Sequence, residues 1–383
     1  MDKIILKAGI ADIAEKVYAG ERISDEMGVR LYECKDVHAL GLLANYVREK
    51  KNGDRATYVY NLYINYSNIC ILSCQFCAFA RRPKQEGGFQ YDIDEMVRLA
   101  SEAYEQGASE VHIVGGLNPK LPFAYYLEMV SGIKKACPEM MVKAFTAIEI
   151  RHLAERINKK PIRETLEELR SAGLAALTGG GAEIFDPEVR DKICRGKETA
   201  DEWIEVHKTW HQMGQRSTCT MLYGHIETLQ QRVDHLRRLR ELQDETSGFT
   251  AFVPFAFEPE NNKLSHLKRV TAIEDLRNLA VSRIYLDNFD HITAYWISMG
   301  LPLAQIALSY GVDDLHGTIQ KERIFHMAGS QTPQEQRVAV LERAIREAGR
   351  TPARRNTVYD IIPDAVPRHA ATPGVASLSE VPA

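Results

Sequence analysis

The chain has 383 residues, 45% of them hydrophobic and 26% charged, which is typical of a globular protein. Its formal net charge of −4 gives no reason to expect nucleic acid or an anionic membrane as a partner. No apolar stretch is long enough to cross a bilayer, and the start, MDKIILKAGIADIAEKV, lacks the apolar core of a signal peptide, so we expect a cytoplasmic protein. The seven cysteines are an odd number and three are clustered, which favours metal or redox chemistry over a disulfide framework.

Residues 1–57 are predicted to form a helical extension. Beyond them short apolar runs, the expected strands, alternate with helical patterns. Asp92 and Glu95 resemble a helix N-cap and its capping-box partner. A later apolar stripe repeats every three or four residues, which predicts an amphipathic helix; it comprises Ile226, Leu229, Val233, Leu236, Leu239 and Leu242. The expected strands are YNLYINY (60–66), VHIVGG (111–116), MVKAFT (141–146), LAALT (174–178), STCTMLYG (217–224), FTAFVPFAF (249–257), RIYLDNFD (283–290) and QIALSYG (305–311).

Eight strands that alternate with helices predict an α/β fold, a (β/α)₈ TIM-type barrel over residues 58–330, rather than an open sheet. Thr332 and Pro333 are predicted to begin a helix that ends near Gly349, within a helical extension over 331–363. Residues 364–383 are rich in Ala, Pro and Ser, and we expect them to be disordered.

The motifs follow the expected strands, where a βα barrel builds its active site. Three cysteines follow the first strand, and Gly115 and Gly116 end the second. The run Gly179–Gly181 follows the fourth strand and predicts close approach of the backbone to a ligand or to the barrel rim. Tyr223, Gly224 and His225 end the fifth. We expect all of them on the same rim.

Cys70, Cys74 and Cys77 have the spacing C-x₃-C-x₂-C, one ligand short of a closed zinc site. A structural zinc with His112 or His225 as fourth ligand stays open. The alternative is a four-iron–four-sulfur cluster held by three thiolates, with one iron open to an outside ligand. The remaining cysteines are isolated and are predicted to be packing residues or inert thiols; they are Cys34, Cys137, Cys194 and Cys219.

The cysteine spacing after the first strand, the aromatic Phe76 before the last cysteine and the Gly-Gly at the end of the second strand together resemble the radical S-adenosylmethionine (SAM) superfamily. The resemblance implies a 4Fe-4S cluster on the three cysteines and SAM bound to the open iron. It implies that Gly115 and Gly116 meet the SAM amino group, although Leu117 stands where that motif often has glutamate. A one-electron donor such as flavodoxin or ferredoxin is also implied.

Residues 58–329 further resemble the aminofutalosine synthase family of the futalosine route to menaquinone, through segments such as GGGAEIFDPEVRDKIC, TMLYGHIET and DDLHGTIQKERIFHMAG. The resemblance implies that the 5′-deoxyadenosyl radical adds to the enol-ether double bond of 3-[(1-carboxyvinyl)oxy]benzoate, so that SAM is consumed. KAFTAIEI (143–150) favours this family over the related cyclic dehypoxanthine futalosine synthases, which tend to have HAFSP there. That cyclase and a non-catalytic iron–sulfur electron carrier remain alternatives. The chain departs from the family pattern at Thr178, Ser247, Asn118 and His316.

A substrate with two carboxylates needs cationic or hydrogen-bond donors, for which the candidates are His225, Asn261, Asn262 and Lys143. The adenine of SAM needs an apolar or aromatic shelf, for which the candidates are Phe76, Phe79 and Tyr63. Glu183 is the candidate for the ribose hydroxyls of SAM and, with His225, for a catalytic role.

Each of these candidates has a structural alternative. Tyr63 suits barrel packing, and His225 suits a cap on the next helix. Lys143 can point outward from its strand, and Glu183 can serve the first turn of a helix, where acids are favoured. The sequence indicates no oligomeric state.

Overall fold

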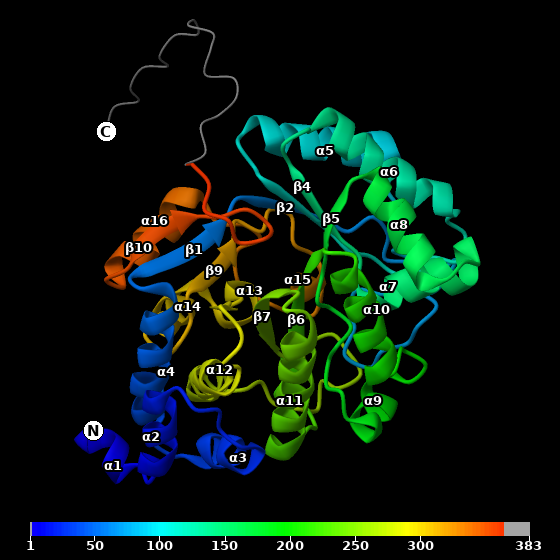
Figure 1. The fold of residues 1–383 in the computed structure, drawn as a ribbon. Helices are drawn as coiled ribbons and strands as arrows, with labels where there is room; N and C mark the ends of the chain where they lie inside the picture. Colours follow the sequence, from blue (N-terminus) through cyan, green and yellow to red (C-terminus); the bar gives the residue numbers. More distant parts are fainter. Residues whose placement is uncertain (1, 364–383) are drawn as a thin grey trace, which may run out of the picture.

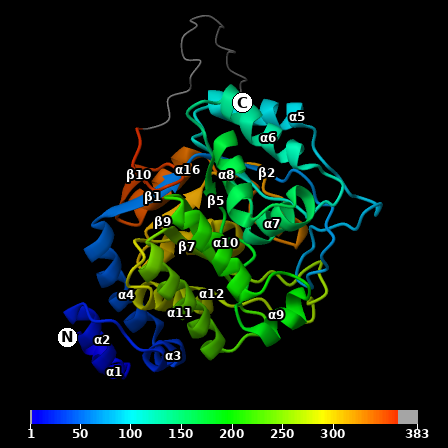
Figure 2. The same ribbon diagram turned by 45° about the vertical axis from the view of Figure 1, so that its right-hand side comes forward.

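The computed structural model describes residues 2–363. Four helices begin the chain, in agreement with the predicted helical start: α1 (Lys3–Lys7), α2 (Ala11–Ala19), α3 (Asp25–Glu33) and α4 (Val37–Asn52). The Ser24 hydroxyl accepts a hydrogen bond from the Met27 amide and caps α3, while the Asp36 carboxylate caps α4. In Figures 1 and 2 these blue helices lie beside α11 (Leu229–Thr246) and α12 (Ala272–Tyr285), against which α3 and α4 pack.

The centre of the fold is a parallel sheet of seven strands in the order β2-β3-β4-β5-β6-β7-β8. The strands are β2 (Asn61–Ile64), β3 (Glu110–Ile113), β4 (Met141–Ala144), β5 (Leu174–Leu177), β6 (Arg216–Tyr223), β7 (Phe249–Ala256) and β8 (His291–Ile292). Helices follow the strands and cover the outer face of the curled sheet (Figure 1); the main ones are α5 (Ile93–Glu105), α6 (Phe123–Ala136), α8 (Ile162–Ala172), α10 (Ala200–Gln212), α11 and α12. The hydrophobic core lies between this sheet and its helices. The predicted α/β barrel class is confirmed, and β2–β7 coincide with the first six expected strands.

The last two expected strands were wrong. RIYLDNFD (283–290) begins inside α12, and the strand that follows, β8, starts only at His291. QIALSYG (305–311) begins inside α14 (Leu301–Ala307), and the strand is β9 (Asp314–Gly317). A short buried apolar run has the same composition in a helix and in a strand, so periodicity alone did not separate them. The true strand, DLHG, is half polar, and its buried Asp314 pairs with Arg355 at 2.8 Å.

A second sheet of three strands has the order β10-β1-β9, with β1 at Arg55–Val59 and β10 at Thr351–Arg354. Single bridges join β9 and its continuation to both edges of the larger sheet, at Thr293↔Asp314 and Leu62↔Gln320. The predicted eight-stranded barrel is therefore a curled sheet of seven strands. The eighth strand, β9, pairs regularly with β1 in the smaller sheet instead.

The helix predicted from Thr332 begins later, as α16 (Val338–Glu347). Thr332 instead donates a hydrogen bond from its hydroxyl to the Ile297 carbonyl at 3.1 Å, which ties the preceding segment to the barrel. The strand β10 was not predicted. The predicted disordered tail, 364–383, lies outside the described residues.

Two helix predictions were confirmed. α5 begins directly after Asp92, although Glu95 pairs with Arg98 at 2.8 Å rather than completing a capping box. α11 buries the predicted stripe from Val233 to Leu242. The remaining helices are α7 (Ala147–His152), a π-helical turn at Leu153–Asn158, α9 (Pro187–Cys194), α13 (Trp296–Met299) and α15 (Ile324–Met327). No helix within residues 2–363 has the length and hydrophobicity required to span a bilayer.

Candidate active site

The three clustered cysteines lie in the long loop between β2 and α5, as predicted. The loop is held by its own backbone: the Cys70 amide donates to the Arg81 carbonyl and the Arg81 amide to the Asn68 carbonyl, both at 2.8 Å. The Gln75 amide donates to the Ile193 carbonyl at 2.7 Å, which ties the loop to α9. The positions of the cysteines are thus fixed by hydrogen bonds that do not depend on a bound group.

The glycine pair after β3 lies directly against this loop. A Cβ atom on Gly116 would lie 2.4 Å from the Ile69 carbonyl oxygen, and one on Gly115 would lie 2.6 Å from the Tyr66 ring. The Gly116 amide also donates to the Ser67 carbonyl at 2.7 Å. These positions therefore require glycine for the packing of the cysteine loop, whatever ligand their backbone contacts.

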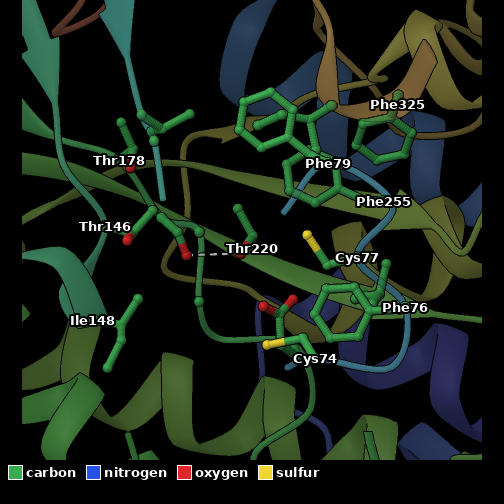
Figure 3. Close-up of a pocket in the computed structure, with 18 of the residues that line it drawn as sticks. Cys74, Phe76, Cys77, Phe79, Thr146, Ile148, Thr178, Thr220, Phe255 and Phe325 are labelled. Carbon is green, nitrogen blue, oxygen red and sulfur yellow. Dashed lines mark hydrogen bonds between the residues drawn. The ribbon is translucent and has the colours of Figure 1, made fainter. Parts of the chain in front are cut away.

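Cys70, Cys74 and Cys77 line one cavity of about 290 Å³ at the carboxyl ends of the strands. The glycine pair and Gly179–Gly181 line it too. Figure 3 shows an aromatic wall, formed by Phe76, Phe79, Phe255 and Phe325, and a polar wall with Thr146, Thr178 and Thr220. The predicted common rim is confirmed for these motifs. The His225 segment lies outside the lining.

The glycine run after β5 makes the predicted close approach. A Cβ atom on Gly179 would lie 2.5 Å from the Cys219 Cα of β6, so the two backbones are in contact. Thr220 strengthens that contact, since its hydroxyl donates to the Gly179 carbonyl at 2.7 Å. Cys219 itself is fully buried and acts in packing, as predicted.

The three cysteine side chains fit a four-iron–four-sulfur cluster. Burial raises the pKa of the thiols of Cys74 and Cys77, so a bound cation is what would keep them as thiolates. Within residues 2–363, no three His, Cys, Asp or Glu side chains converge to hold one metal ion. A cluster does not require such convergence, because each of its thiolates binds a different iron atom.

A charged group lies beside the cysteines. The Lys197 ammonium forms a buried ion pair with Glu183 and lies 5.8 Å from the centre of the Phe76 ring. Burial alone would lower the pKa of Lys197, but Glu183 and Glu198 raise it well above its ordinary value. Glu183 lines the cavity and has a left-handed backbone, with φ 45°, that is costly for a residue other than glycine.

Sequence reasoning missed Glu149, which follows β4. Its carboxylate accepts hydrogen bonds from the Gly115 amide at 3.0 Å, the Tyr66 hydroxyl at 2.8 Å and the Thr146 amide at 2.8 Å. Burial raises the pKa of this carboxyl group, and the group lines the cavity. The available signal was the Thr146-x-x-Glu149 capping box, which marks a helix start and gives no hint of the bond to Gly115.

The other candidates divide into two groups. Tyr63 and Lys143 line the cavity, so the outward orientation of Lys143 is wrong. His225 lies outside the lining, where its Nε2 bonds the Leu222 carbonyl at 3.0 Å and its Nδ1 accepts from the Ile226 amide at 2.7 Å. Asn261 and Asn262 are also outside and bond the carbonyls of Met327 and Glu258.

Two of the four departures from the family pattern line the cavity: Thr178, whose hydroxyl donates to the Phe145 carbonyl at 2.9 Å, and His316. Asn118 is buried and donates to Gln90 at 3.1 Å, across the base of the cysteine loop. The fourth departure, Ser247, is the C-cap of α11. Its backbone is left-handed (φ 49°), a conformation in which glycine is the favoured residue.

Comparison with known proteins agrees with this site. Residues 64–239 match the Radical SAM superfamily, and residues 246–368 match the CofH/MqnC C-terminal region. Two curated relatives are called aminodeoxyfutalosine synthase. The one from Thermus thermophilus is 49% identical over 91% of this chain and 94% of its own, and the one from Streptomyces coelicolor is 41% identical over 92% and 93%. A cyclic dehypoxanthine futalosine synthase from S. coelicolor is 37% identical over 92% of this chain and 89% of its own.

Solved structures support the fold. The FeFe-hydrogenase maturase HydG from Carboxydothermus hydrogenoformans has a TM-score of 0.73 and 18% identity, covering 92% of this chain and 81% of its own. Methylornithine synthase (PylB) has a TM-score of 0.71 and 19% identity, covering 89% and 97%. The chain belongs to the radical SAM superfamily and, within it, to the family of the aminodeoxyfutalosine synthases.

Proposed function

We propose that this chain transfers the adenosyl part of SAM to 3-[(1-carboxyvinyl)oxy]benzoate. The 5′-deoxyadenosyl radical adds to the enol-ether double bond; rearrangement, loss of one carboxylate as CO₂ and release of one electron from the remaining radical then give aminodeoxyfutalosine. The observation that carries the proposal is that the three cysteines, the glycine pair and the segment 143–150 all border the same cavity. The relatives with the highest identities given above bear the corresponding name.

The first group of residues would bind the cluster and SAM. Cys70, Cys74 and Cys77 would hold a 4Fe-4S cluster, which would supply one electron for cleavage of the C5′–S bond of SAM. A flavodoxin or ferredoxin is the class of protein that would deliver that electron. The backbone of Gly115 and Gly116 would meet the SAM amino group.

The walls of the cavity position SAM and protect the radical. Phe76 and Phe79 provide the apolar shelf for adenine, and Glu183 accepts hydrogen bonds from the ribose hydroxyls. The aromatic wall excludes water, which a reactive primary alkyl radical requires. Glu149 fixes the Gly115 amide and so the position of the glycine pair.

The test is product analysis under anaerobic conditions. Reconstituted protein is incubated with a reductant, SAM and the enol-ether benzoate, and the products are identified by mass spectrometry. The proposal expects an adenine-containing adduct of the benzoate in proportion to the SAM consumed. Free 5′-deoxyadenosine without such an adduct would contradict it.

The cyclase reaction is the second candidate, because a cyclic dehypoxanthine futalosine synthase is also a relative. A cyclase would abstract hydrogen from its own substrate and release 5′-deoxyadenosine. Supplying dehypoxanthine futalosine to the same sample separates the two: a cyclised product would favour the cyclase, and unchanged substrate would favour the synthase.

A further inference from the structure

Three side chains form one row across the inner face of the sheet. Tyr63 of β2 pairs in register with His112 of β3, and His112 pairs with Lys143 of β4. All three border the cavity, together with His316, which follows in β9. The Tyr63 ring stacks on His112 with 4.3 Å between ring centres, and its hydroxyl is 3.4 Å from His316 Nε2. The row is therefore a preformed surface on the wall of the cavity.

This surface contains donors that have no hydrogen-bond partner in the described part of the chain. Lys143 is 4% exposed, yet within residues 2–363 its ammonium makes no hydrogen bond or ion pair. Burial lowers the pKa of Lys143 and the nearby Glu110 opposes this, but the Glu110 carboxylate is already bonded to Asn61 and Thr357, each at 2.9 Å. The Nδ1 atoms of His112 and His316 are also buried, and no described residue bonds them.

The chemistry of these groups selects an anionic ligand. A buried ammonium without hydrogen bonds is costly, and a carboxylate removes the cost by supplying both a negative charge and acceptor oxygens. Burial lowers the pKa of both imidazoles, so each is neutral and can donate one N–H to the same carboxylate.

The position of the row decides which carboxylate binds there. The radical reacts with the double bond, so the vinyl end of the substrate must lie next to the cysteine loop. His112 lies within β3, whereas Gly116, which contacts that loop, follows the carboxyl end of β3 by three residues. The row therefore lies deeper in the barrel than the cysteine loop, and the carboxylate on the aromatic ring is the one at the far end of the substrate from the double bond.

We propose that Lys143, with His112 and His316, binds the ring carboxylate of the substrate and thereby sets the depth at which the double bond lies. This inference rests on the proposed function for the identity of the substrate. It assigns Lys143 a role in specificity that no other residue of the row can replace, because Lys143 is the only amine of the row and so the only group there that can pair as an ammonium with the bound carboxylate.

The test measures binding to the reconstituted holoenzyme with two unreactive probes, 3-methoxybenzoate and its neutral amide, 3-methoxybenzamide. By titration calorimetry, the unsubstituted protein should prefer the carboxylate. Lys143→Met should lower the affinity for the carboxylate about ten- to a hundredfold, because one charge-assisted contact is lost. The affinity for the amide should be unchanged. Lys143→Arg should keep a preference for the carboxylate. Lys192→Met, on the exposed face of α9, is the matched control and should bind both probes as the parent does.

Folding is checked by thermal unfolding, and Lys143→Met should unfold at the same temperature or higher, because an unpaired buried charge is removed. If Lys143→Met still prefers the carboxylate, or loses both probes equally while folded, the inference is wrong. The proposed function fails independently, if the unsubstituted enzyme yields no adduct with the enol-ether benzoate.

Discussion

Replacing Gly116 by alanine tests whether the glycine pair holds the cysteine loop in place. The new methyl carbon would lie 2.4 Å from the Ile69 carbonyl oxygen and 2.8 Å from its carbon, whereas real contacts of this kind essentially never fall below 3.0 Å. The Ile69 backbone, adjacent to Cys70, must therefore move by at least about 0.6 Å, which exceeds the tolerance of about 0.5 Å for a binding constellation. Overpacking of this kind costs about 1–3 kcal/mol of the free energy of unfolding.

The assay has two parts: urea unfolding of the metal-free protein, and iron content after anaerobic reconstitution. We expect the free energy of unfolding of the Gly116→Ala variant to fall by about 1–3 kcal/mol. We expect its iron content to fall by at least half, because Cys70 is displaced relative to Cys74 and Cys77. Gly132→Ala is the control. Gly132 lies within α6, where its added methyl would lie 3.1 Å from a Val97 methyl and 3.9 Å from an Ile93 methyl, both side-chain atoms, and alanine gains about 1 kcal/mol of helix propensity. A Gly116→Ala protein with the stability and iron content of the parent would refute the reasoning.

Three further predictions concern the cluster, a buried acid and a helix end. A single alanine substitution of Cys70, Cys74 or Cys77 should abolish the visible absorbance of the cluster, whereas substitution of Cys137 or Cys219 should leave that absorbance unchanged. Loss of iron from a folded Cys219 variant would contradict this ligand set. Burial raises the pKa of Glu198 to about 7 from its ordinary 4.5, so its contribution to stability is present below pH 4.5 and is lost as the pH rises through 7. The free energy of unfolding should fall by up to about 3 kcal/mol across that window, and urea titrations of Glu198→Gln should show a flatter profile. Ser247→Gly should raise the free energy of unfolding by about 0.5–1 kcal/mol, because Ser247 has a left-handed backbone; an unchanged urea midpoint would count against the observed φ of 49°.

The sequence predicted the parts of the site that are local in the chain. Three cysteines within eight residues must share one loop, and a Gly-Gly at a strand end must lie on the rim. The glycine run was also predicted correctly, because a backbone without Cβ atoms indicates close approach wherever the partner strand lies. Its actual neighbour, Cys219 of β6, was beyond the reach of any local pattern.

The errors arose where tertiary contacts outweigh local composition. The apolar run 283–290 begins in a buried helix, α12, and the strand β9 contains Asp314, whose charge is tolerated because Arg355 from the end of the chain pairs with it. No local pattern indicates that pair, because its two residues are 41 positions apart. The same holds for Glu149, whose bond to the Gly115 amide joins residues 34 apart.

The residues that break the usual rules of folding gather around one cavity. Among residues 2–363, Lys143 is buried without a bonded partner, His112 and His316 have buried ring nitrogens without partners, and Glu183 has a left-handed backbone. Each feature costs stability, and a sequence selected only to fold would replace them with apolar side chains or glycine. Because all four border the same space as the three cysteines, the cost is best explained by ligands that satisfy these groups: a dianionic substrate at the depth of the cavity and SAM at its rim. Binding of these ligands should therefore raise the unfolding temperature of the holoenzyme, and the rise produced by the benzoate should shrink in Lys143→Met while that produced by SAM persists.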